Sequence, residues 1–457
     1  MRFRFRFTGP RIPGYLACLV AGVAGVAVLV FGLIAAYSIP SPATSAVSKN
    51  DGSTSHSSTS HSSAPSASAT PRIRIQAARV SWVATWAASP MAASDSVQAE
   101  QGFSDQTIRE IIYVSAGGDA LRVHLSNLFG TRPLTIGGAS VGVVLVGDEL
   151  VPGSSRRLTF GGKPAVTVPA GATVTSDPLS GTLAPLSELA LSIYLPHPTG
   201  PATNHGYAAQ TTFVASGDQL ADAKGTSFTH REPSWYFATE VDVRTATADG
   251  TIVAFGDSTT DGIGSESGAD DRWPNFLARR LETALGDRAP GVVDEGISGN
   301  RVLTGSRCFG QSGLVRFERD ALSEPGVRAV IVLEGINDIG FAMGAPNACT
   351  VPVNRPMTAA LIEAGYLRLI AMAHARGIKV YLGTLTPAPY REPLRSEVNS
   401  WILTSHAADG VIDFAAATSE PGDPHYYNPD YNSGDNLHPN DLGYAMMADA
   451  IPLAWVG

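Results

Sequence analysis

Charged residues are scarce in this chain: they make up 16% of its 457 residues, and the formal net charge is −9. No basic stripe runs through the body of the sequence, which argues against nucleic acid as a partner. No internal repeat is visible either. The chain is nevertheless 44% hydrophobic and 8% aromatic, a composition typical of globular rather than disordered proteins. Its length is sufficient for two domains with full-sized cores.

One long segment, residues 15–39, lacks charge altogether and is rich in Val, Ala, Leu and Gly, and a basic flank with four arginines (residues 1–14) precedes it. This order is typical of an export signal, and the arginines predict a cytoplasmic N-terminus. The run has the roughly 20 residues needed to span a bilayer, which favours an uncleaved signal-anchor. The small residues at 43–46 are compatible with a cleavage site, so a cleaved signal peptide is the alternative.

Residues 40–75 have almost no apolar side chain larger than Val and consist mostly of Ser, Thr, Ala, Pro and His. Such a segment buries too little surface to offset its ordering entropy, so we expect a disordered linker. His56 and His61 lie in this linker, where solvated side chains are a better interpretation than metal ligands.

Cysteine occurs only three times. Cys18 falls in the apolar run, whereas Cys308 and Cys349 lie in the part expected to be exported, where thiols oxidise. No further Cys or His stands near them at ligand spacing. We therefore predict a disulfide between Cys308 and Cys349, whose loop of about 40 residues corresponds to about 4 kcal/mol in the chain-entropy model.

Residues 76–247 carry strand-like patterns without helical periodicity. The runs 109–114 and 120–125 flank a Gly-Gly-Asp turn and predict a β-hairpin. Strands at regular spacing indicate a β-sandwich-like domain. Further runs lie at 139–146, 165–168 and 189–195.

From residue 248 to residue 457 the pattern changes to alternating strands and helices. This alternation predicts a parallel sheet covered on both faces, a three-layer α/β/α domain. The expected helices are Trp273–Leu285 and Thr358–Ala375, and the expected strands are Ile252–Phe255, Val292–Asp294, Ala329–Leu333, Lys379–Thr384 and Val411–Phe414.

A serine stands just after the first of these strands, where residues 255–262 read FGDSTTDG. The carboxyl edge of a parallel sheet is where open α/β folds place their ligands, and the flanking glycines permit a tight turn. Ser258 is therefore a candidate nucleophile, provided that a base and an oxyanion site occur elsewhere.

The candidate base is His438, three residues after Asp435. At this spacing the carboxylate can accept a hydrogen bond from one ring nitrogen and leave the other free as a base. Two further turns, 296–300 and 334–338, follow the second and third strands and fall at the edge where the serine lies. There the N–H groups of Gly299 and Ser258 and the side-chain amide of Asn337 would hold an oxyanion.

This ordered set of Ser258, Gly299, Asn337 and His438, with Asp435, resembles the GDSL or SGNH hydrolase family from about residue 251 to the C-terminus. The Gly-Asp-Ser-Leu motif of the family reads Gly-Asp-Ser-Thr here, which leaves the nucleophile in place. The resemblance implies a flavodoxin-like fold and ester hydrolysis through a serine acyl-enzyme, without a metal or other cofactor. The motif set also resembles a secreted subgroup that places a β domain before the hydrolase and is grouped with xylan-degrading acyl esterases; its segments are 272–274, 296–301 and 334–340, with 125–130 and 210–212 in the β domain.

Four neighbours of these motifs receive supporting interpretations. Asp257 and Asp338 adjoin site residues and are interpreted as turn or supporting residues. Trp273 is interpreted as a packing residue at a helix start rather than a sugar platform, and Glu334 as a structural hydrogen-bond acceptor. The β domain either supports the hydrolase by packing, which we favour, or binds sugar.

The sequence thus predicts an extracytoplasmic serine esterase that acts on O-acyl esters, acetyl above all, of a carbohydrate. The expected partner is a small-molecule or polysaccharide ester, together with a membrane if the N-terminal segment stays uncleaved. One alternative is a lipase or arylesterase of the same fold. Another is a carbohydrate-binding protein with a vestigial hydrolase domain.

Overall fold

The computed structural model describes residues 80–94 and 96–457. The predicted segments 1–14, 15–39 and 40–75 all lie outside these residues. Within the described part of the chain, no helix is both long and apolar enough to cross a membrane.

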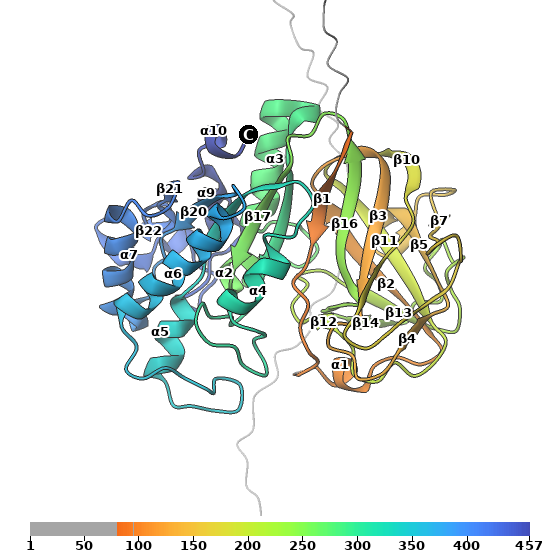
Figure 1. Ribbon diagram of the computed structural model, residues 1–457, viewed down its shortest axis with the longest axis horizontal. Coiled ribbons are helices and arrows are strands. Elements are labelled where there is room, and N and C mark those ends of the chain that lie inside the picture. The colour runs from red at the N-terminus through yellow and green to blue at the C-terminus, as the bar shows by residue number, and fades with distance from the viewer. Residues whose placement is uncertain (1–79, 95) are drawn as a thin grey trace, which may run out of the picture. The chain divides into compact units, whose positions relative to one another are not determined.

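Two antiparallel sheets form the first half of the described chain (Figure 1). Side chains of both sheets, such as Val123 and Val241 of one and Ile112 and Leu191 of the other, share one hydrophobic core. A sandwich of this kind confirms the predicted β domain. The first sheet has the order β1 (Ser81–Ala87), β16 (Ala238–Thr245), β3 (Gly118–Ser126) and β10 (Leu179–Leu183), with β9 (Thr173–Thr175) beside β3.

The second sheet has the order β14 (His230–Glu232), β13 (Thr212–Ser216), β2 (Gln106–Val114), β11 (Ser187–Leu195), β5 (Gly138–Val146) and β6 (Glu149–Leu150), with β7 (Arg156–Arg157) beside β5. Shorter elements complete this half: α1 (Val97–Gln101) and the strand pairs β4 (Leu134–Ile136) with β8 (Val166–Val168) and β12 (Asn204–His205) with β15 (Trp235–Tyr236).

The predicted hairpin of β2 and β3 is wrong. β2 pairs with β11 and β13 in one sheet, whereas β3 pairs with β16, β10 and β9 in the other. The connecting residues cross between the sheets, and the Ser115 N–H donates to the Thr85 carbonyl of β1 on the way. Side-chain alternation is the same for neighbouring strands and for strands in facing sheets, so it does not distinguish the two arrangements.

A five-stranded parallel sheet forms the second half, with the order β18 (Gly291–Gly296), β17 (Thr251–Gly256), β19 (Val327–Leu333), β20 (Lys379–Gly383) and β21 (Gly410–Ile412). This is the flavodoxin-like order 2-1-3-4-5, as predicted. The helices contact one another in two groups, as a sheet covered on both faces requires. In one group α3 (Trp273–Leu285) contacts α9 (Asp441–Asp449); in the other, α6 (Ala359–His374) contacts both α4 (Gly313–Asp320) and α7 (Leu394–Thr404).

The longer helices are α3 (Trp273–Leu285), α4 (Gly313–Asp320), α5 (Ile336–Met343), α6 (Ala359–His374), α7 (Leu394–Thr404) and α9 (Asp441–Asp449). The short elements are α2 (Ser258–Asp261), α8 (Phe414–Thr418), α10 (Leu453–Val456), η1 (Gly286–Arg288), η2 (Pro389–Arg391), η3 (Pro429–Tyr431), β22 (Ser419–Glu420) and β23 (Asp423–Tyr427).

The last predicted strand runs too far. Phe414 was expected to end it, but this residue begins α8. The Asp413 carboxylate accepts a hydrogen bond from the Ala416 N–H (3.0 Å), and this N-cap starts the helix directly after the strand.

β1 of the β domain packs against β18 of the hydrolase sheet. The Val292 N–H donates to the Ser115 hydroxyl (2.8 Å), and the Ala84 N–H donates to the Thr251 hydroxyl (3.1 Å). At Gly291 a Cβ atom would lie 2.0 Å from the Ala84 carbonyl oxygen, so only glycine allows this close approach. The two halves therefore meet through backbone and buried polar groups.

Candidate active site

The strand register brings three turns to one edge of the parallel sheet. Gly256 of β17 is level with Gly296 of β18 and with Leu333 of β19. The chain after each of these residues therefore leaves the sheet at the same height. This is also where the strand order reverses, the usual ligand position in open α/β sheets.

Ser258 is the first residue of α2, directly after β17. Asp257 caps the helix: its Oδ1 accepts the Thr259 N–H at 3.1 Å. Gly256 is required by close packing, since a Cβ atom there would lie 2.2 Å from the Leu333 carbonyl oxygen. Gly262, with φ of 95°, caps the C-terminus of α2, so a short, tightly packed turn holds the serine.

Ser258, His438 and Asp435 form a chain of hydrogen bonds. The Ser258 Oγ lies 2.8 Å from His438 Nε2, and His438 Nδ1 lies 2.6 Å from Asp435 Oδ2. Because the carboxylate accepts the Nδ1 proton, Nε2 is left to accept the proton of the serine hydroxyl. This is the geometry of a nucleophile, a base and an orienting acid.

The Asp435 carboxylate is also held by its own turn. Its Oδ1 accepts the N–H groups of Leu437 and His438, both at 2.9 Å, and the Ser433 hydroxyl at 3.2 Å. Partial burial opposes its ionisation, but the hydrogen bonds from the His438 ring and from the two N–H groups outweigh burial and hold the pKa of Asp435 below its usual value. Asp435 is therefore a carboxylate at neutral pH.

The N–H groups of Ser258 and Gly299 have no acceptor among the described residues. Asn337, in the first turn of α5, donates one amide hydrogen to the Asn300 carbonyl (3.0 Å). Its second amide hydrogen is not used by this bond. The three donors predicted for an oxyanion thus lie on the three turns that the register brings together.

The turn that carries Gly299 is braced from both sides. Asp338 accepts the N–H groups of Val302 (2.8 Å) and Leu303 (3.1 Å), and burial raises its pKa to about 6. Gly299 itself has φ of 78°, and a Cβ atom would lie 2.3 Å from the Phe309 ring. Asp338 is therefore a supporting residue, and glycine is required at position 299.

Buried acids cluster behind the site. Burial raises the pKa of Asp257 to about 7 and that of Glu334 to about 8. The interpretation of Glu334 as a hydrogen-bond acceptor is wrong, because neither carboxylate oxygen has a hydrogen-bond partner among the described residues. The nearest ion-pair contact is Arg316, at 3.9 Å, so the glutamate is held as a neutral acid.

Arg316 of α4 has no motif that would reveal its role, yet it links the serine turn, the oxyanion turn and the β domain. Its fully buried guanidinium donates to the carbonyls of Gly256 (2.8 Å) and Glu295 (2.7 Å). It also donates to Asn300 Oδ1 and to the Ser89 hydroxyl of the β domain, both at 2.9 Å. The fixed fork of an arginine suits several acceptors at once.

Trp273 is fully buried and packs against Phe414 with 5.6 Å between ring centroids. The prediction of a packing residue is confirmed, and a role as a sugar platform is excluded.

One group among the described residues is close enough to hold a metal ion, His124 with Glu240 and Asp242 on β3 and β16. His124 Nε2 and Arg122 Nε already contact Asp242 Oδ2, at 2.9 and 2.5 Å. His124 Nδ1 lies 3.5 Å from Glu240. We assign this group to ion pairing within the β domain.

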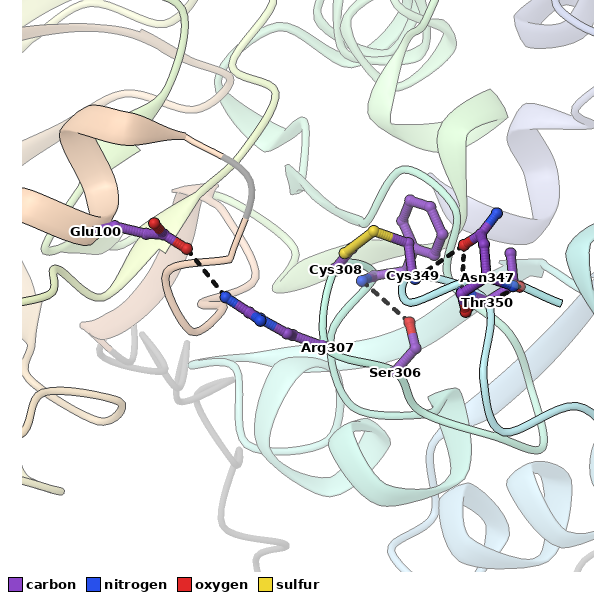
Figure 2. The surroundings of a disulfide bond; sticks show 8 residues. Glu100, Ser306, Arg307, Cys308, Asn347, Cys349 and Thr350 are labelled. Atoms are coloured by element: carbon purple, nitrogen blue, oxygen red, sulfur yellow. Dashed lines mark hydrogen bonds and ion pairs between the residues drawn. A yellow bond between two sulfur atoms is a disulfide. The ribbon is translucent and has the colours of Figure 1, made fainter.

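The predicted disulfide between Cys308 and Cys349 is present, with 5.0 Å between the Cα atoms (Figure 2). It ties the turn after β18 to the segment after α5. Next to it, Arg307 pairs with Glu100 of α1 at 3.0 Å (Figure 2). Arg301 reinforces the tie by donating to the carbonyls of Thr350 (3.1 Å) and Pro352 (2.7 Å).

Residues 254–446 match the GDSL-like lipase/acylhydrolase family. The C-terminal domain is therefore a GDSL-like lipase/acylhydrolase domain. Members of this family are hydrolases that act on esters, so the hydrogen-bonded serine lies in an ester hydrolase domain. The GDSL match covers the serine turn, both oxyanion turns and the histidine turn.

Among solved structures, the chain is similar to an acetyl xylan esterase (20% identity, 44% of this chain and 96% of the other, TM-score 0.34). It is also similar to a lipase/acylhydrolase from Enterococcus faecalis (22%, 44% and 92%, TM-score 0.33). A GDSL-like lipase from Bacteroides thetaiotaomicron is a third (22%, 45% and 86%, TM-score 0.32). No curated protein sequence matches the chain significantly.

Proposed function

We propose that the chain is an extracytoplasmic serine esterase that removes short O-acyl groups, acetyl above all, from a carbohydrate. The observation that carries the proposal is the hydrogen-bonded chain from Ser258 through His438 to Asp435. It lies on the same edge as the N–H groups of Ser258 and Gly299, which have no acceptor in the described part of the chain. Ser258 attacks the ester carbonyl while His438 takes its proton, and Asp435 stabilises the imidazolium. His438 then donates this proton to the leaving alcohol.

The oxyanion is received by the N–H groups of Ser258 and Gly299 and by the Asn337 amide. Each such donor contributes about 3 kcal/mol to transition-state stabilisation. Water then attacks the acyl-enzyme with His438 as base, and Ser258 is released. No step in this sequence needs a redox or group-carrying cofactor.

A small acyl group is supported by the Phe309 ring, which lies in contact with Gly299. Phe309 stacks on Phe341 with 5.2 Å between centroids, so a pair of aromatic rings walls one side of the oxyanion turn. We propose that these rings restrict the acyl side of the site to short groups. The carbohydrate alcohol is supported by the sequence resemblance to secreted acyl esterases with a β domain.

An extracytoplasmic location is supported by the apolar run 15–39 after a basic flank. The Cys308–Cys349 disulfide fits an oxidising compartment. Fractionation of the producing cells tests the location: ester hydrolase activity should be found in the membrane or external fraction, and a cytosolic pool would contradict it.

Ser258→Ala tests the nucleophile. Without the hydroxyl no acyl-enzyme forms, so kcat for p-nitrophenyl acetate should fall at least about 10⁴-fold, with an unchanged circular dichroism spectrum. The matched control is Ser400→Ala on the exposed surface of α7, which should keep wild-type turnover. Turnover by Ser258→Ala at the wild-type rate would remove Ser258 as the nucleophile.

A ladder of p-nitrophenyl esters and acetylated xylan separates the substrate classes. The proposal expects the highest kcat/KM with acetyl and release of acetate from xylan. A preference for acyl chains of about eight carbons or more would favour the lipase alternative. A folded protein without turnover on any ester would favour the vestigial one.

A further inference from the structure

A histidine of the β domain reaches the catalytic half of the molecule. His205 of β12 is 3% exposed, and its Nε2 lies 2.9 Å from Asp261 Oδ1. Its Nδ1 lies 3.0 Å from the Ser89 carbonyl oxygen. Asp261 is the last residue of α2, the helix that begins with Ser258. His205 is thus a direct contact between the β domain and the nucleophile turn.

Asp261 connects this contact to the oxyanion turn. Its Oδ2 accepts hydrogen bonds from both the N–H (2.8 Å) and the hydroxyl (2.6 Å) of Ser298. Ser298 directly precedes Gly299. Because Ser298 is held at two atoms, the next peptide, which carries the Gly299 N–H, starts from a fixed point.

The hydrogen-bond partners determine the protonation of His205. The Ser89 carbonyl can only accept a hydrogen bond, so Nδ1 of His205 carries a hydrogen. Nε2 contacts Asp261 Oδ1, because the other carboxylate oxygen already accepts two hydrogen bonds from Ser298. Both ring nitrogens of His205 therefore face oxygen acceptors, an arrangement that favours the imidazolium. Burial opposes this charge, but Asp261 and the Ser89 carbonyl outweigh it and raise the pKa of His205.

Other charged groups lie near the pair of His205 and Asp261, and their own charges cancel. Asp294 of β18 and Arg272, which precedes α3, lie 3.5 Å apart and add one negative and one positive charge. Burial and the negative charge of Asp261 raise the pKa of Tyr207, and the positive charge of Arg272 opposes them. Trp235 of β15 covers the His205 ring, with 5.7 Å between centroids. The surroundings thus exclude water and keep the ion pair in one orientation.

We propose that His205 is a positioning residue for ester hydrolysis: from the β domain it holds Asp261, and through Asp261 and Ser298 it holds the Gly299 N–H that receives the oxyanion. The proposal rests on the proposed function of Ser258 and Gly299. It makes the β domain a working part of the active site, although His205 does not touch the reacting atoms.

His205→Ala is the first test. Loss of the clamp displaces the Gly299 N–H relative to the developing oxyanion, so kcat for p-nitrophenyl acetate should fall about tenfold or more while KM changes less than about threefold. His205→Gln should recover part of kcat, because its amide can still donate to Asp261. The matched control is His230→Ala, which removes an exposed histidine of the same domain that pairs with Glu232.

The partner in the relay is tested by a double-mutant cycle with Asp261→Asn. If His205 acts through Asp261, the double variant should lose no more kcat than the worse single variant. Losses that multiply, or a His205→Ala enzyme with kcat within twofold of wild type, would overturn the proposal.

A folding defect is separated from a positioning defect by thermal melting of each variant. If His205→Ala does not fold, His205→Gln is compared with His205→Asn, whose amide is too short to reach Asp261. The proposal expects the shorter side chain to have the lower kcat, and equal values would contradict it. Wild-type turnover in Ser258→Ala would instead show that the proposed function itself is wrong.

Discussion

At the scale of single residues, the site depends on groups that are useful only together. Ser258 and His438 are 180 positions apart in the chain, yet their side chains share a 2.8 Å hydrogen bond. Asp435 has a different task, since it selects the tautomer in which His438 Nε2 can accept a proton. Its removal should therefore affect catalysis without removing the nucleophile.

Asp435→Asn tests this task. The amide can still occupy the turn, but it can donate to Nδ1 and so favour the wrong tautomer of His438. We expect kcat for p-nitrophenyl acetate to fall by about 10³–10⁴-fold, with little change in the melting temperature. A loss below about tenfold would show that His438 does not need this carboxylate.

Glu334 allows a prediction about pH and stability. Its pKa is raised to about 8 by burial, so between about pH 4.5 and 8 the folded protein keeps a proton that the unfolded chain releases. The free energy of unfolding should therefore fall with rising pH across this window, by about 1.4 kcal/mol per pH unit. Glu334→Gln cannot ionise and lacks this loss.

The measurement is denaturant unfolding of both proteins from pH 5 to pH 9. The unfolding free energy of Glu334→Gln minus that of the wild type should increase as the pH rises and become constant above about pH 8. A difference that is independent of pH would show that Glu334 is ionised in the folded protein throughout.

At the scale of elements, the disulfide turn and the oxyanion turn form one unit. Cys308 directly precedes Phe309, whose ring contacts Gly299. The Asn300 amide donates to the carbonyl of Gln311 at 2.8 Å. Greater motion of the disulfide turn would therefore also increase the motion of the Gly299 N–H.

Replacing both Cys308 and Cys349 by serine should lower stability and activity together. The chain-entropy model for this loop gives about 4 kcal/mol, and removal of a native disulfide commonly costs about 2–5 kcal/mol. Denaturant unfolding measures the first effect and kcat for p-nitrophenyl acetate the second. A reductant should lower stability and activity in the wild type and leave the double variant unchanged. Unchanged stability and activity of the reduced wild-type protein would contradict the prediction.

Elements were predicted from sequence where a local pattern decides them. The helix expected at Trp273–Leu285 has these bounds in the structure, and the buried parallel strands read as plain apolar runs. The hairpin of β2 and β3 could not be tested by such patterns, because strand pairing depends on which sheet each strand joins. Phe414 shows the same limit on a smaller scale, since the Asp413 cap overrides the apolar run.

At the scale of the whole molecule, the site was predictable only in part. The residues that follow strands reveal themselves through turn chemistry, and parallel pairing brings them together. His205 and Arg316 carry no such signal. Their importance comes from the packing of the β domain against the hydrolase sheet, which no local pattern records.

The β domain should therefore be needed for folding of the hydrolase half. A fragment of residues 248–457 would expose the face of β18 and leave Asp261 and Arg316 without His205 and Ser89. We expect this fragment to be insoluble or unfolded, whereas residues 76–457 should be soluble and active. Expression yield, circular dichroism and polysaccharide pull-down compare them.

A soluble fragment with full esterase activity would contradict this expectation. Sugar binding that persists in a 76–247 fragment would add a recognition role to the supporting one.

The contact between His205 and Asp261 also limits which domains can be exchanged by recombination without loss of activity. If a recombination event joined this hydrolase to another β domain, the new chain would keep every motif of the esterase. It would lose the imidazolium that Asp261 requires, unless the new domain carried a histidine at the matching place. We therefore expect recombination to transfer the β domain and the hydrolase domain together. In a chimeric esterase, the fusion points should lie outside both domains.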